Sequence, residues 1–171
     1  MKYKSFETDR LYLRPTSESD SEFIFKLLNT PKWLKYIDDR KIKSVLNTRK
    51  YIKDIMISQL ESHGYSTYTL ITKCNNQKVG ICGLFNKNNI KRVEIGFALL
   101  PEYEKNGFAF ESSNKLIQVA SIEFGINTVW AVTKKENIPS QRLIKKLGLK
   151  LIGTTKITKQ KEELLLYKIE M

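Results

Sequence analysis

Residues 94–109 read EIGFALLPEYEKNGFA, and the hydrophobic period of the chain changes in the middle of this stretch. Up to Leu99, apolar residues alternate with small or polar ones, which is the period of a β-strand. Pro101 ends the strand because it has no N–H group for the ladder. After Gly107, apolar residues recur at helical spacing to about Phe124. The stretch therefore predicts a strand, a short loop and a helix, with a glycine at the helix entrance.

Such a helix entrance is suited to bind an anion. The first N–H groups of a helix have no partner within it, and the helix dipole is positive there. Gly107 has no Cβ, so a bulky anion can approach the main chain. Asn106-Gly107 is also typical of a hairpin turn, but a helical pattern rather than a second strand follows it. The loop has neither the three spaced glycines of a dinucleotide-binding fold nor the Gly-Lys-Ser/Thr of a nucleotide-binding P-loop.

Length and composition fit one folded domain over residues 1–171. Hydrophobic residues make up 41% of the 171 residues and aromatic residues 11%, enough to bury a core. The sequence has no long apolar run and no signal-peptide pattern, so we expect a soluble cytoplasmic protein with no membrane partner. Cys74, Cys82 and the single His63 fit no common metal-ligand spacing. We therefore expect no metal site and two reduced thiols.

The chain is strongly basic, with a formal net charge of +12 and a pI near 9.6. This balance favours polyanionic partners such as nucleic acid, a ribosome or an anionic cofactor. The basic residues are scattered along the chain, however, which is equally typical of a solvated surface. No spacing of a known nucleic-acid-binding motif is present, which argues against a nucleic-acid partner.

The rest of the pattern predicts a mixed sheet flanked by helices. Strands are expected at about 7–15, 65–72, 79–85, 128–133, 151–157 and 163–169, and helices after Asp20, over about 44–62 and from Pro139. Polar turns join the strands that precede the helix at Gly107, which predicts an antiparallel meander. That helix separates the strand of Glu94 from the strand at 128–133, so these two should run parallel. The predicted fold class is α/β, with a mostly antiparallel sheet that contains one parallel pair.

The loop at the helix entrance resembles a known cofactor loop. Residues 101–112, PEYEKNGFAFES, resemble the acetyl-CoA pyrophosphate loop of the GNAT acetyltransferases, in the form PEYWGKGYATEA seen in ribosomal-protein N-acetyltransferases. Gly107 and Ala109 match the wider family pattern Gln/Arg-x-x-Gly-x-Gly/Ala. Glu104 departs from it, because it replaces the Gln or Arg.

Two further segments carry the same resemblance. The opening of the chain, through Asn29-Thr30-Pro31, is similar to the start of the ribosomal-protein subgroup, TERLxLRPLxxxDxxxLxxLLNDP. Residues 137–149, NIPSQRLIKKLGL, resemble the GNAT block N-x-x-S-x-x-x-x-x-x-L-G-F. The resemblance thus covers about residues 6–169.

The resemblance implies a GNAT fold with acetyl-CoA as co-substrate. Pantetheine is expected to lie along the strand of Glu94, next to main-chain groups of Ile95, Phe97 and Leu99. The diphosphate is expected on main-chain N–H groups of Glu104, Lys105, Asn106, Gly107, Phe108 and Ala109. Asn137 and Ser140 are expected at the pantetheine arm. The carboxylate of Glu104 is unfavourable next to a diphosphate unless it points to solvent, and Lys105 is a candidate to compensate for it.

Acetyl transfer from a thioester to an amine needs a neutral amine and a proton for the leaving thiolate. Glu94 is the candidate general base, because Gly96 and Ala98 on its strand face should leave a groove beside it. The structural alternative for Glu94 is an ordinary polar residue on an exposed strand face.

The candidate general acid is Ser140. Many GNAT enzymes have a tyrosine seven residues after the asparagine, but Ile144 occupies this position here and cannot donate a proton. Tyr103 and Tyr167 are weaker candidates. The structural alternatives are a helix-start serine for Ser140 and simple N-capping for Asn137.

The acceptor is expected to be a primary amine that attacks directly. In the GNAT resemblance, the first helices form one wall of the acceptor cleft, so Trp33, Tyr36 and Glu94 are candidate substrate contacts. Core packing is the other interpretation for Trp33. The acceptor is then a protein N-terminal amine, such as that of a ribosomal protein, or a small amine.

Two alternatives stay open at this point. An antibiotic or a polyamine would be a different acceptor for the same fold, although a polycation should prefer an acidic cleft and this chain is basic. A basic nucleic-acid- or ribosome-binding domain without catalysis would belong to a different functional class. The sequence does not distinguish a monomer from a homodimer.

Overall fold

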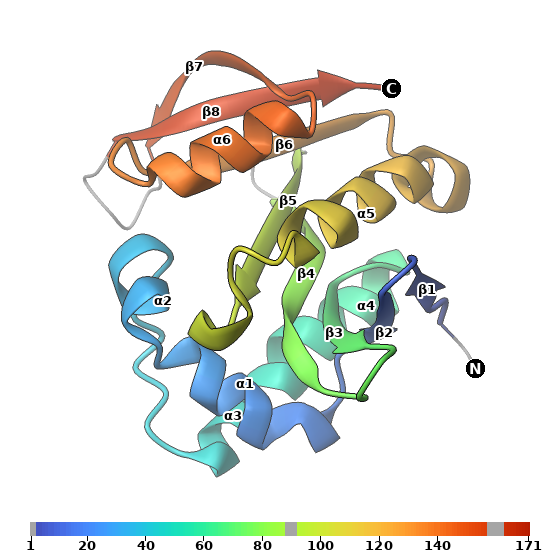
Figure 1. The fold of residues 1–171 in the computed structure, drawn as a ribbon, viewed down its shortest axis with the longest axis vertical. Coiled ribbons are helices and arrows are strands. Elements are labelled where there is room, and N and C mark those ends of the chain that lie inside the picture. The colour runs from blue at the N-terminus through green and yellow to red at the C-terminus, as the bar shows by residue number, and fades with distance from the viewer. Residues whose placement is uncertain (1–2, 88–91, 157–162) are drawn as a thin grey trace.

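The computed structural model of the protein describes residues 3–87, 92–156 and 163–171 (Figure 1). Its centre is one eight-stranded sheet with the strand order β1-β2-β3-β4-β5-β6-β8-β7. The strands are β1 (Phe6–Glu7), β2 (Leu11–Pro15), β3 (Thr67–Thr72), β4 (Lys78–Lys87), β5 (Arg92–Leu99), β6 (Thr128–Thr133), β7 (Lys150–Lys156) and β8 (Glu163–Glu170). All neighbouring strands are antiparallel except β5 and β6, which run parallel. The predicted fold class, the meander and the parallel pair are therefore confirmed.

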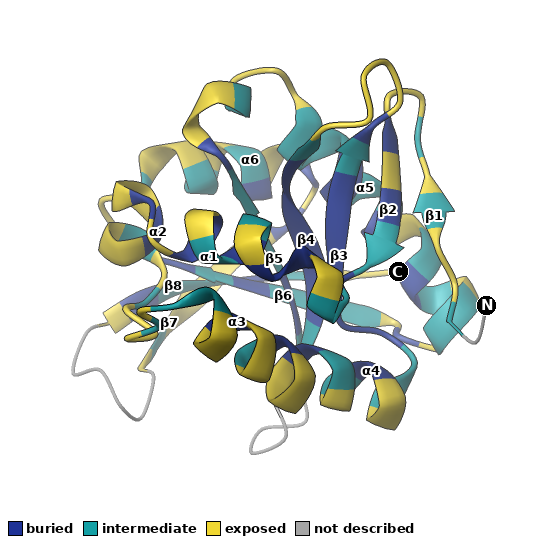
Figure 2. Ribbon diagram, turned by 90° about the horizontal axis from the view of Figure 1, so that it is seen from below, coloured by how far each residue is buried: buried dark blue, intermediate teal, exposed yellow. Residues whose placement is uncertain are grey.

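Helices cover both faces of the sheet (Figures 1 and 2). The helical segments are α1 (Ser21–Leu28), α2 (Pro31–Tyr36), α3 (Val45–Tyr51), a π-helical segment (Ile52–Ile57), α4 (Ser58–His63), a 3₁₀ turn (Pro101–Tyr103), α5 (Phe108–Phe124) and α6 (Ile138–Lys146). In the described part of the chain, no helix is long and apolar enough to cross a membrane.

Two hydrophobic clusters lie on opposite faces of the sheet. The larger one packs α5 and α6 against the strands, with Leu116 and Ile144 both buried. The smaller one packs α1, α2 and the π-helical segment, with Leu27 and Ile52 both buried. Because side chains alternate along a strand, neighbouring residues of β4 join different clusters: Ile81 joins the smaller cluster and Cys82 the larger. The central strands are thus fixed from both sides.

The structure departs from the sequence predictions in local detail. The expected strand at 7–15 is two short antiparallel strands, β1 and β2. Strand β3 begins at Thr67, two residues later than expected, and is almost entirely buried because both of its faces are covered. The helix predicted from Ser44 to Ser62 is present, but its middle is π-helical, a feature that has no signal in the sequence. The final hairpin forms with β8 between β6 and β7, and Ile157, its expected limit, lies outside the described residues.

Candidate functional site

Strands β5 and β6 separate soon after they meet. Among the described residues, Glu94 and Trp130 are the one facing pair in their ladder, although β5 continues to Leu99 and β6 to Thr133. On its other edge, β5 pairs with β4 along its whole length, from Arg92 to Leu99. A gap in the backbone ladder therefore opens on the β6 side of β5.

The direction of the main-chain groups of β5 follows from its pairing with β4. The N–H group of Leu100 donates to the carbonyl of Val79 at 2.9 Å. Because hydrogen-bonded and non-hydrogen-bonded pairs alternate in an antiparallel ladder, the main-chain groups of Ala98 also point toward β4. Those of Phe97 and Leu99 then point the other way, toward the gap. This is the edge along which the GNAT resemblance implies a pantetheine arm.

The loop after β5 exposes a row of donors. Gly107 precedes the first turn of α5 with φ 83°, and Lys105 has φ 63°, so the backbone is left-handed at both positions. Over the described ranges, no protein acceptor takes a hydrogen bond from the N–H groups of Lys105, Asn106, Gly107, Phe108 or Ala109. With the positive end of the 17-residue helix α5 behind them, these groups form a site that fits a diphosphate.

Glu104, expected among these donors, is not one of them, because its N–H group already donates to the carbonyl of Pro101 at 3.3 Å. Its carboxylate forms an ion pair with Lys32 of α2. Lys105, the residue considered for this role from the sequence, is exposed. Sequence reasoning missed Lys32, because nothing local links a lysine on the second helix to a loop seventy residues later.

Glu94 is buried and already ion-paired. Its side chain is 7% exposed, and the Nε atom of Arg92 donates to its Oε1 atom at 2.9 Å. The guanidinium of Arg92 also lies over the ring of Trp130, 5.6 Å from the ring centroid. The interpretation of Glu94 as an exposed strand residue is therefore wrong. Arg92, two residues away, was missed as its partner.

The groove expected beside Glu94 is not open at Gly96. The ring of Phe85 covers this glycine, since a Cβ atom there would lie 2.8 Å from the Cε2 atom of Phe85. The same ring lies 2.8 Å from the Cβ position of Gly83. These two glycines make room for an aromatic ring of the protein rather than for a ligand at that point.

Asn137 and Ser140 lie at the start of α6. The Oδ1 atom of Asn137 accepts a hydrogen bond from the N–H group of Ser140 at 3.3 Å, so Asn137 is the N-cap of this helix. The side chain of Ser140 is partly buried. Ile144 lies one turn further along the helix and is part of the core, at 1% exposure. This helix therefore presents Ser140, and no tyrosine, near its N-terminus.

The two tyrosines considered as proton donors differ in their surroundings. Tyr167 of β8 is fully buried, and in the described part of the chain its hydroxyl has no hydrogen-bond partner. Burial raises the pKa of Tyr167 above its ordinary value. Tyr103 lies in the 3₁₀ turn after β5 and lines a surface cavity instead.

The predicted acceptor contacts on α2 are only partly accessible. Trp33 is buried in the smaller hydrophobic cluster with residues of α1, which is the packing role that was its alternative. Tyr36, at the end of the same helix, is partly buried, and the Nζ atom of Lys35 lies 4.9 Å from its ring centroid. Of these two aromatic residues, Tyr36 is thus the one placed to reach a ligand.

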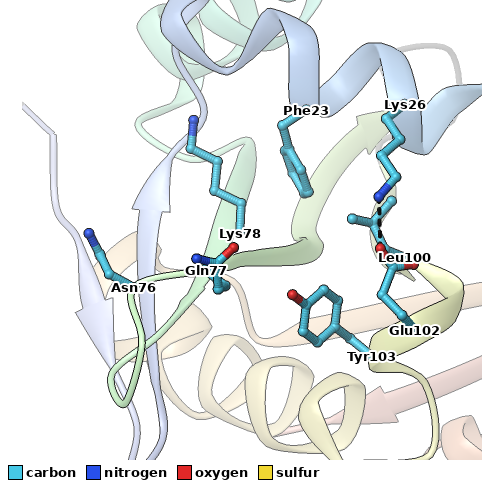
Figure 3. A pocket seen from close by; sticks show the side chains of 8 residues that line it. All are labelled: Phe23, Lys26, Asn76, Gln77, Lys78, Leu100, Glu102 and Tyr103. Atoms are coloured by element: carbon cyan, nitrogen blue, oxygen red, sulfur yellow. Dashed lines mark hydrogen bonds and ion pairs between the residues drawn. The ribbon is translucent and has the colours of Figure 1, made fainter.

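A cavity of about 360 Å³ lies on the α1 side of the 3₁₀ turn (Figure 3). Its lining is Phe23, Lys26, Asn76, Gln77, Lys78, Leu100, Glu102 and Tyr103. Two of these lining residues are bonded to each other, because Lys26 donates to Glu102 at 2.7 Å. Neither Glu94, Ser140 nor the donors at Gly107 line this cavity, so it is separate from the candidate site.

Comparisons with known proteins agree with the geometry. Residues 10–150 match the family model of the acetyltransferase (GNAT) domain. The chain is 29% identical over 149 residues to the uncharacterized N-acetyltransferase YoaA of Bacillus subtilis (strain 168), covering 86% of this chain and 83% of YoaA.

Two solved structures have the same fold. The RimL ribosomal L7/L12 alpha-N-protein acetyltransferase in complex with coenzyme A superposes with a TM-score of 0.83, at 16% identity, over 98% of both chains. The microcin C7 self immunity acetyltransferase MccE, in complex with acetyl-CoA and AMP, superposes with a TM-score of 0.81, at 17% identity, over 96% of this chain and 94% of that one.

These matches span nearly the whole chain, and they give no support to a non-catalytic nucleic-acid-binding domain. The resemblance of the loop at Gly107 and of the block at Asn137 is confirmed at the level of the family. The chain belongs to the GNAT acetyltransferase family.

Proposed function

We propose that this acetyltransferase takes its acetyl group from acetyl-CoA and transfers it directly to a primary amine. The observation that carries the proposal is the row of N–H groups from Lys105 to Ala109 without protein acceptors, next to the gap between β5 and β6. A diphosphate fits the first and a pantetheine arm with its amides fits the second. The coenzyme A and acetyl-CoA complexes among the structural neighbours support the same donor.

The residues of β5 and of the loop act mainly by placing the reactants. Acetyl-CoA supplies an activated thioester, and the main-chain groups of Phe97 and Leu99 would hold its arm along β5. Correct placement of two reactants can contribute roughly 7–11 kcal/mol relative to their free encounter. Few dedicated catalytic side chains are then needed.

We assign the proton transfers to two side chains. Glu94 accepts the proton of the attacking amine, and Arg92 holds its carboxylate in place through the bond to Oε1. Ser140 donates a proton on the thiol side, since its N–H group is tied to Asn137 and its hydroxyl lies in the first turn of α6. In this assignment, Asn137 orders the turn that carries Ser140.

For the acceptor, we propose the terminal amine of a protein or a small molecule with one amine. The negative charge of Glu94 is offset by Arg92, so a polyamine or an aminoglycoside gains little from it. The neighbour that acts on a ribosomal protein N-terminus fits this acceptor class. The self-immunity neighbour supports an antibiotic-like amine as the second candidate.

A thiol-release assay with acetyl-CoA tests the proposal. Acceptors would include short peptides with free N-termini, single amino acids, polyamines and aminoglycosides. Cys74 is an exposed free thiol, so a Cys74→Ser variant removes the background of the assay, whereas Cys82 is buried. Two free thiols also fit the reducing cytoplasm, where we place the protein. Absence of both coenzyme A binding and thiol release with every acceptor would contradict the proposed function.

A further inference from the structure

Three basic residues from the first part of the chain hold the loop between β5 and α5. They bind alternate positions: Lys26 binds Glu102, Lys32 binds Glu104, and Arg10 binds the residue at 106. Lys26 and Lys32 each reach a side-chain carboxylate. Arg10 differs, because its Nη1 atom donates to the main-chain carbonyl of Asn106 at 3.0 Å.

Arg10 is held in this position from several directions. Its Nε atom donates to Oε2 of Glu111 at 2.7 Å, and its own N–H group donates to Oε1 at 3.0 Å. Thr8 also bonds to Oε1 of Glu111. The guanidinium lies over the ring of Phe108, 4.8 Å from the ring centroid. Although its side chain is 51% exposed, these contacts from both the loop and the first turn of α5 fix its orientation.

The bond to Asn106 has a direct consequence for the anion site. In a trans peptide the carbonyl oxygen and the following N–H group point in opposite directions, because the peptide unit is planar. With the carbonyl of Asn106 fixed on Arg10, the N–H group of Gly107 must point away from Arg10. Gly107 itself has a left-handed backbone, and α5 begins directly after it.

Arg10 also offsets a negative charge at the helix entrance. Burial alone would raise the pKa of Glu111, but hydrogen bonds from Thr8 and Arg10 outweigh it, and the pKa lies below its ordinary value. Glu111 is therefore ionised at neutral pH in the first turn of α5, where an unpaired carboxylate would repel a bound diphosphate. The guanidinium of Arg10 neutralises it.

We infer that Arg10 is a positioning residue for the diphosphate loop, which it orients by holding the carbonyl of Asn106 so that the N–H group of Gly107 faces the ligand. This inference rests on the proposed use of acetyl-CoA. It assigns a role in donor binding to the turn between β1 and β2, about a hundred residues before the loop in the sequence.

The test compares Arg10→Ala and Arg10→Lys with a matched control, Lys4→Ala. Lys4 forms an ion pair with Glu123 near the other end of the same helix, so its loss removes one positive charge and one ion pair without touching the loop. Coenzyme A affinity is measured by calorimetry, and turnover is measured with acetyl-CoA and with S-acetyl-pantetheine, which lacks the diphosphate.

We expect Arg10→Ala to weaken coenzyme A binding by roughly 10- to 100-fold, the range for a lost hydrogen bond to a charged group. Turnover of S-acetyl-pantetheine should stay within about twofold of the wild type, because this donor does not use the loop. Arg10→Lys should bind coenzyme A with an affinity between those of the wild type and the alanine variant. A single ammonium keeps the charge but lacks the planar fork that reaches both Asn106 and Glu111.

Three results would overturn the inference while leaving the proposed function intact. These are unchanged coenzyme A affinity in Arg10→Ala, wild-type affinity in Arg10→Lys, or an equal loss in Lys4→Ala. An equal loss of turnover with both donors in the two Arg10 variants would indicate general damage and would also overturn it. Failure of the wild-type protein itself to bind coenzyme A would instead refute the proposed function.

Discussion

The two ends of β5 contribute different kinds of chemical group to the candidate site. At its carboxyl end, the loop from Lys105 to Ala109 offers main-chain N–H groups, whose directions depend on backbone conformation. At its amino end, Glu94 offers a buried side chain that is bonded to Arg92, and its facing residues in the sheet are Phe85 and Trp130. The first arrangement tolerates an unusual side chain such as Glu104, because the donors are main-chain groups and the Glu104 carboxylate is paired with Lys32. The second depends on the identity of every neighbour.

The largest expected effect is on coenzyme A binding at the carboxyl end of β5, where Gly107 is replaced by valine. A β-branched residue is strained at φ 83°, and its Cβ atom would lie 3.2 Å from the Nη2 atom of Arg10. We expect coenzyme A binding to fall below detection in calorimetry. Gly125→Val is the matched control, because Gly125 has φ 65° at the other end of α5 and has open space around it. Both variants should lose stability, and equal losses of affinity in the two would contradict the loop assignment.

The next effect concerns the proton donor at the start of α6. If Ser140 supplies a proton, Ser140→Ala should lower kcat by roughly 10²–10⁴, the range for general acid catalysis, with coenzyme A affinity unchanged. Tyr167→Phe is the comparison variant. The Tyr167 hydroxyl has no partner among the described residues, so its removal should leave kcat unchanged and the Tm equal or higher. Reversal of these two results would transfer the donor role to Tyr167.

At the amino end of β5, we expect Glu94→Gln to cause a smaller loss of kcat. The amide keeps the size of the side chain but accepts no proton, so kcat should fall by about 10² while the affinity for coenzyme A is retained. Arg92→Met is a second test variant, because it leaves the carboxylate of Glu94 buried without the partner that is bonded to its Oε1 atom. Steady-state kinetics at saturating acetyl-CoA checks both variants. Full activity of Glu94→Gln would reduce Glu94 to a structural member of its ion pair.

The smallest expected effect is a pH dependence of folding stability, and it comes from Asp20, which lies outside β5. Asp20 is fully buried beside Arg14 and Lys78. Burial would raise its pKa, but hydrogen bonds from these two residues outweigh this effect and the pKa lies below its ordinary value. The unfolded chain then binds the proton more readily, so this stabilisation is complete above about pH 5 and is lost as the pH falls through the unfolded value of about 3.9 and then the folded pKa.

Urea unfolding between pH 3 and pH 7 measures this dependence. Asp20→Asn should flatten the acidic part of the curve, and its coenzyme A affinity should equal that of the wild type because Asp20 lies outside the diphosphate loop. An unchanged slope in the variant would assign the acid sensitivity to the exposed carboxylates that are also held by basic residues, such as Glu102.

The same contrast explains what the sequence could and could not predict. The order of strand, loop and helix was readable because Pro101 fixes its own φ and ends the strand, and because Gly107 permits the left-handed backbone at the helix entrance. The parallel pair followed from the intervening helix. The environment of Glu94 was not readable, since its facing residues in the sheet, Phe85 of β4 and Trp130 of β6, come from two other strands.

The long-range partners of the diphosphate loop were not predicted, for the same reason. Arg10 and Lys32 bind the loop from more than seventy residues away, and no local pattern marks either of them as a ligand of that loop. The burial of Trp33 depends on how α1 and α2 pack together, which the spacing of its apolar neighbours left undecided.

An NMR titration of the ¹⁵N-labelled protein with coenzyme A tests the central claim most directly. The account predicts the largest amide shifts at Lys105 to Ala109, led by Gly107, with a second group at Phe97 and Leu99. Shifts concentrated instead around the cavity at Gln77 and Lys78, with the amide of Gly107 unmoved at saturation, would contradict it.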